Sequence, residues 1–148
     1  MRRGVALLLL LVTLVFAGAA AAAWPTGIYV GKLRSPGFGF GTRGQTPIRL
    51  QVSKTQLRVL SAQLSFRCPN AKARLPVKIG PLKPVKIRVR PDTGGAQFSL
   101  NQPVGTAHVT IAGGITPGKP LQGILDATRD LPSGDICEDS ALFTAKPR

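Results

Sequence analysis

The amino-acid sequence predicts an all-β protein, either an antiparallel β-sandwich or a small β-barrel of about eight strands. Thirteen prolines and seventeen glycines are spread along the 148 residues, which leaves little room for long helices. Between them lie several short runs in which apolar and polar residues alternate, and this period is that of half-buried strands. Regularly spaced strands are typical of sandwiches and of barrels, and the alternation alone does not separate the two.

The first candidate strand is residues 27–32, and a clear alternation of apolar and polar residues over 48–53 predicts the second. The next run, residues 57–68, alternates over a greater length. Its apolar parity changes between Val59 and Leu60, which predicts a bulge or bend within that strand.

Further candidate strands follow at residues 75–79, 85–89, 96–100, 107–111, 121–128 and 137–145. Clusters of Pro, Gly, Asn, Asp and Ser separate most of them and predict turns. Cys137 has the parity of Phe143 in the last strand, and Cys68 has the parity of Phe66. Both sulfur atoms are therefore expected to face the interior.

Residues 1–23 are predicted to be a secretory signal peptide. Two arginines precede an apolar run from Val5 to Phe16, and the small residues that end at Ala23 fit a cleavage site. Cleavage would leave residues 24–148 as a single secreted or cell-envelope-associated β domain without a transmembrane segment. The alternative is an uncleaved membrane anchor, because the apolar stretch approaches the length that spans a bilayer.

Cys68 and Cys137 are the only two cysteines in the sequence. Export would place them in an oxidising compartment, so they are expected to form a disulfide. Two distant cysteines and one histidine lack the closely spaced pairs of a zinc site. We therefore expect neither a metal nor a cofactor.

Charge is divided unevenly along the chain. Residues 24–91 contain fourteen Lys and Arg and no acid, whereas residues 92–148 contain four bases and six acids. Residues 24–148 therefore carry a net charge of +12, that is, +14 and −2 for the two parts. An imbalance of this kind attracts polyanions and is screened by salt.

The candidate binding residues in the basic part lie at 83–90. Lys86, Arg88 and Arg90 alternate with apolar residues, which would space them about 6.6 Å apart on one exposed strand face, and Lys83 extends this stripe. Such a stripe could contact regularly spaced phosphates or sulfates. The alternative is a solvated face that protects a sheet edge from pairing.

Residues 33–46 are predicted to form a glycine-rich loop that contains Phe38 and Phe40. The two rings could stack on bases or sugars beside the basic residues, or they could pack together within the loop. The glycine spacing matches a dinucleotide-binding fingerprint, but a strand follows where that fingerprint needs a helix. No nucleotide cofactor is therefore expected.

An enzyme is not expected, because no residues combine acid, base and nucleophile at a recognisable spacing. His108 is the single histidine and is predicted to lie on an outward strand face between threonines. Five acids gather between Asp126 and Asp139. Calcium binding or glycoside hydrolysis are possible uses of such a cluster, but pairing with the basic part of the chain is the expectation.

The start at residues 27–32, the strand 48–53, Cys68 and the closing segment 137–146 together resemble a group of uncharacterised secreted bacterial proteins of actinobacterial type. The resemblance implies export and a small β domain with one disulfide, and it implies no activity for particular residues. Our leading hypothesis is a non-enzymatic domain that binds an anionic envelope polymer through a basic face. The alternative is a protein-interaction or inhibitor module that presents loop 33–46 to a protein partner.

Overall fold

Residues 24–34 and 46–148, which the computed structural model describes, contain ten β-strands and no helix. The strands are β1 (Gly27–Arg34), β2 (Thr46–Val52), β3 (Gln56–Phe66), β4 (Leu75–Ile79), β5 (Val85–Lys86), β6 (Arg88–Val89), β7 (Ala96–Val104), β8 (Ala107–Ile115), β9 (Leu121–Asp130) and β10 (Ile136–Pro147). They pair antiparallel in the order β4-β3-β2-β1-β10-β9-β8-β7-β6, and β5 pairs with β3. The all-β antiparallel prediction is confirmed. Within the described ranges no helix could cross a membrane.

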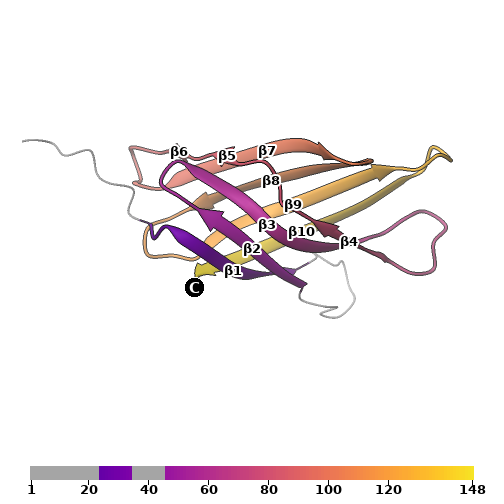
Figure 1. Ribbon diagram of the computed structural model, residues 1–148, viewed down its shortest axis with the longest axis horizontal. Coiled ribbons are helices and arrows are strands. Elements are labelled where there is room, and N and C mark those ends of the chain that lie inside the picture. Colours follow the sequence, from indigo (N-terminus) through magenta and orange to yellow (C-terminus); the bar gives the residue numbers. More distant parts are fainter. Residues whose placement is uncertain (1–23, 35–45) are drawn as a thin grey trace, which may run out of the picture.

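The sheet folds over on itself, so that β1–β3 form a layer that crosses the layer of β7–β10 (Figure 1). Apolar residues of both layers form one buried core. The two ends of the sheet approach each other at residues 85–89, where β5 pairs with β3 and β6 pairs with β7. No strand pairing joins β5 to β6, so the sheet does not close into a barrel, and the fold is a sandwich-like open sheet. The strand predicted at 85–89 is divided in two because its halves pair with different layers.

The predicted bulge in β3 is present. Pairing between β2 and β3 passes from Arg49–Ser61 to Leu50–Val59, which leaves Leu60 as the extra residue. The carbonyl of Val59 accepts a hydrogen bond of 2.9 Å from the backbone N–H of Leu82. The bulge therefore anchors the loop that leads into β5.

The disulfide joins Cys68, just after β3, to Cys137 at the start of β10, with a Cα–Cα distance of 4.1 Å. Both cysteines are buried, as their parity predicted. Beside them Asp139, 8% exposed, accepts a 2.7 Å hydrogen bond from the backbone N–H of Ser65. Its carboxylate also lies 3.7 Å from the Arg74 guanidinium. This acid does pair with the basic part of the chain.

Tyr29, the single tyrosine, is buried in β1, and its hydroxyl donates a 2.8 Å hydrogen bond to the carbonyl of Pro25. Burial raises the pKa of this phenol above its ordinary value of 10.0.

The hydroxyl therefore stabilises the fold below pH 10.0, and this contribution is lost as the pH rises through the folded-state pKa. Tyrosinate absorbance should appear at higher pH in the native protein than in denaturant. As the pH is raised, a Tyr29→Phe variant should lose less stability than the unmodified protein. If the tyrosinate absorbance of the native and the denatured protein appeared at the same pH, this prediction would be contradicted.

Candidate functional site

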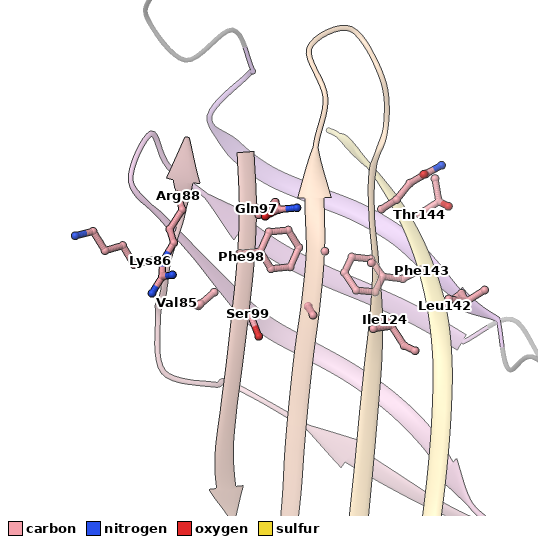
Figure 2. Close-up of a pocket in the computed structure, with 14 residues that line it drawn as sticks. Val85, Lys86, Arg88, Gln97, Phe98, Ser99, Ile124, Leu142, Phe143 and Thr144 are labelled. Carbon is pink, nitrogen blue, oxygen red and sulfur yellow. The ribbon is translucent and has the colours of Figure 1, made fainter. Parts of the chain in front are cut away.

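An open groove of ≈ 1170 Å³ crosses the outer face of β7–β10 (Figure 2). Lys86 and Arg88 stand on one side, and Leu142 and Thr144 stand on the other. Small residues form the floor between them: Ser99, Ala112, Gly113 and Gly123. Among the described residues that line the groove, two are cations and none is an acid. The groove can therefore accept an anionic group without a carboxylate to repel it.

Two buried phenylalanines support the floor from the inner side. Phe98 pairs with Gly113 and Phe143 pairs with Gly123, and the two glycines pair with each other. A Cβ atom on either glycine would lie 2.6 Å from the Cζ atom of its phenylalanine. The rings, 3% and 2% exposed, thus occupy the space that side chains at these glycines would need. The floor is therefore closely packed on its inner side.

One row of paired residues crosses the whole outer face next to this floor. Residues directly opposite each other in neighbouring strands project from the same face. The polar row consists, in order across the sheet, of Arg88, Gln97, Gly114, Gln122, Thr144 and Lys32. Strand spacing of about 4.8 Å gives it a length of about 24 Å. A cation stands at each end of the row, and uncharged hydrogen-bonding side chains stand between them.

The row ends in a second group of cations, which we call the basic face: Lys32, Arg34, Arg49 and Lys146. In β1, Val30 pairs with Lys146 of β10 on one side and with Arg49 of β2 on the other. All four cations are exposed, and β1, β2 and β3 contain no acid. Lys146 belongs to the part of the chain with a negative net charge. Its outward parity was readable from the sequence, but only the β1–β10 pairing places it beside Lys32.

The structure separates the predicted stripe of cations. Lys86 and Arg88 line the groove, whereas the exposed Lys83 and Arg90 lie outside its lining. The backbone N–H of Lys83 donates to the side-chain carbonyl of Gln102 at 3.2 Å, and that of Arg90 donates to the carbonyl of Gly95 at 2.7 Å. Lys83 therefore lies in the loop before β5, and Arg90 lies in the turn between β6 and β7.

Val89, which alternates with Lys86, Arg88 and Arg90, pairs with the buried Ala96 and so lies on the inner face of the sheet, but it is not buried. Its side chain is 53% exposed, because β6 is a two-residue strand at the end of the sheet and no further strand covers it. Phe38 and Phe40 lie outside the described residues, as does the predicted signal peptide. Loop 33–46 is bounded by the Leu33–Thr46 pair, which ends the described pairing of β1 and β2.

His108 and three acids of β9 and β10, namely Asp126, Asp130 and Glu138, share the outer face but lie beyond the groove lining, whereas Asp139 is buried on the inner side. His108 pairs with Thr128, which also pairs with Glu138, and Asp126 pairs with Ser140. Throughout residues 24–34 and 46–148, no group of three or more His, Cys, Asp and Glu is placed to hold a metal ion.

No protein-family model, curated protein or solved structure matches this chain. The fold and the site therefore define its class by themselves. It is an all-β, disulfide-linked domain with an open groove that has cations on one side and a basic face beyond the other.

Proposed function

We propose that this protein is a non-enzymatic extracytoplasmic domain that binds an anionic polymer, such as a polymer of the cell envelope. The observation that carries the proposal is the basic face, where cations from both ends of the chain gather on three neighbouring strands. The Cys68–Cys137 disulfide supports an oxidising environment, as found outside the cytoplasm.

Several exposed cations on one face favour a repeating anion over a single small one. One exposed ion pair contributes little, typically about 0–1 kcal/mol, because water and salt screen it. A polymer can engage the basic face and the groove cations together, so that the small contributions add within one complex. Such binding should weaken steeply with salt.

The first test reverses three charges of the basic face and measures retention of the protein on immobilised heparin across a salt gradient. The variant is Lys32→Glu/Arg49→Glu/Lys146→Glu. It should elute at a much lower salt concentration, and the slope of log affinity against log salt should fall by about three, one for each cation that no longer meets the polymer.

The matched control carries the same change in net charge at exposed positions outside the basic face. It is Lys54→Glu/Lys72→Glu/Lys119→Glu. We expect a clearly smaller shift in elution for this control. Equal shifts for the two variants would mean that net charge alone governs retention, and the proposed binding face would be wrong.

A further inference from the structure

We infer that the groove is a binding site for a linear, hydroxyl-rich anionic glycan, whose chain lies across the strands along the polar row. The inference rests on the proposed function and adds the ligand chemistry and the path of the chain. The path begins at Lys86 and Arg88, follows the floor across β7–β10, and ends at Lys32 of the basic face.

The side chains between the cations match hydroxyl groups better than bare anions. Each amide of Gln97 and Gln122 offers both a donor and an acceptor, and the Thr144 hydroxyl does the same. All three side chains are exposed, and within the described part of the chain no hydrogen bond occupies them. A sugar hydroxyl can donate and accept, whereas an ionised phosphate or sulfate oxygen accepts only. An anion without hydroxyls would leave the amide oxygens of this row unused.

The shape of the floor also favours a sugar chain. Beside the floor, Gly114 stands in the row between the lining residues Gln97 and Gln122 and has no side chain, so a ligand ring can approach the backbone there. Ile124 and Leu142, the latter 52% exposed, pair with each other in the next row and line the same groove. Their apolar surface suits the C–H faces of sugar rings.

A single-stranded nucleic acid fits the groove less well. Such ligands rely on bases that stack on exposed aromatic side chains. The two aromatic residues of the groove lining, Phe98 and Phe143, are buried on the inner side of the floor. Among the described lining residues, therefore, none offers an aromatic face to a base.

A Gly114→Leu variant tests the path without any change of charge. A Cβ atom at this position would meet the carbonyl oxygen of Ala96 at 3.4 Å, an ordinary contact, so the backbone need not move. The leucine side chain would then fill the middle of the polar row. The matched control is Thr128→Leu, at an exposed position of β9 on the same face, but outside the polar row and paired with His108 and Glu138, neither of which lines the groove.

Calorimetric titration with a size-defined heparin oligosaccharide should show binding at least about tenfold weaker for Gly114→Leu, as expected for the loss of one or two hydrogen bonds. Thr128→Leu should bind like the unmodified protein. Unchanged affinity in Gly114→Leu, or an equal loss in both variants, would overturn the groove assignment. The basic-face result with heparin would still stand, so the two proposals can fail separately.

A second comparison tests the ligand chemistry with the unmodified protein. Inorganic polyphosphate supplies charge without hydroxyls, dextran supplies hydroxyls without charge, and single-stranded DNA supplies bases. The heparin oligosaccharide should bind about tenfold more tightly than polyphosphate or DNA of matched charge, and dextran should bind weakest. Polyphosphate or DNA binding as tightly as heparin would overturn the glycan inference while leaving polyanion binding intact. Failure of all three polyanions to bind would overturn both.

Discussion

Replacing Cys68 and Cys137 with alanine is expected to lower the free energy of unfolding by about 4 kcal/mol. The disulfide closes a loop with a sequence separation of 69 residues and connects the two layers of the sandwich. In the chain-entropy model a loop of this length removes about 4 kcal/mol of conformational freedom from the unfolded chain. That is a large share of the 5–15 kcal/mol or so by which most domains are stable.

Denaturant unfolding followed by tryptophan fluorescence measures this effect directly. Trp24 is the single tryptophan and is buried, with its indole N–H 3.3 Å from the carbonyl oxygen of Ser53, so its emission should shift when the fold opens. The alanine variant and the reduced unmodified protein should unfold at the same, lower denaturant concentration. If both unfolded together with the oxidised protein, the disulfide would not stabilise this fold.

Adding a single methyl group at Gly113 is expected to cost about 3 kcal/mol. The new Cβ atom would lie 2.6 Å from the Phe98 ring and 2.9 Å from the Cα atom of Gly123, and it would also meet the carbonyl oxygen of Gln122. Two of these neighbours are backbone atoms of β9 that cannot turn away. The buried ring would have to leave its position, and overpacking of this kind typically costs about 1–3 kcal/mol.

Gly114→Ala is the matched control, because it makes the same chemical change at the next residue on the opposite face. Its Cβ atom would make one ordinary contact, with the carbonyl oxygen of Ala96 at 3.4 Å. Alanine in a strand interior is also favoured over glycine by about 0.5–1 kcal/mol. Thermal unfolding should therefore show a large loss for Gly113→Ala and no loss for Gly114→Ala. Equal losses would contradict the proposed packing of Phe98 on the groove floor.

Much of the local structure was readable from the sequence. The alternation over residues 48–53 and the change of parity at Leu60 correspond to β2 and to the bulge in β3. The inward parity of Cys68 and Cys137 agrees with their burial and bonding. These features depend on neighbouring residues alone, because side chains of a strand alternate between two faces.

For other strands, the sequence predicted too short a length or missed a division into two strands. The sequence predicted a strand at 96–100, whereas β7 continues through Pro103 to Val104. Proline fits there because β7 pairs with β8 along its full length, while its other side is hydrogen-bonded to β6 only at its first residues. The segment 85–89 was predicted as one strand, and the competition of two layers for its hydrogen bonds divides it.

By itself, the sequence determined the all-β class, the disulfide, the exposed cations of β5 and β6 and the uneven distribution of charge. The tertiary structure alone decided that Lys146 lies beside Lys32, and that Arg88 and Lys32 terminate one row across the sheet. The physical reason is that alternation specifies which face a residue occupies within its own strand. Which strands pair, and in which register, depends on the burial of residues far apart in the chain, and a slip of one residue would turn every side chain of a strand to the other face.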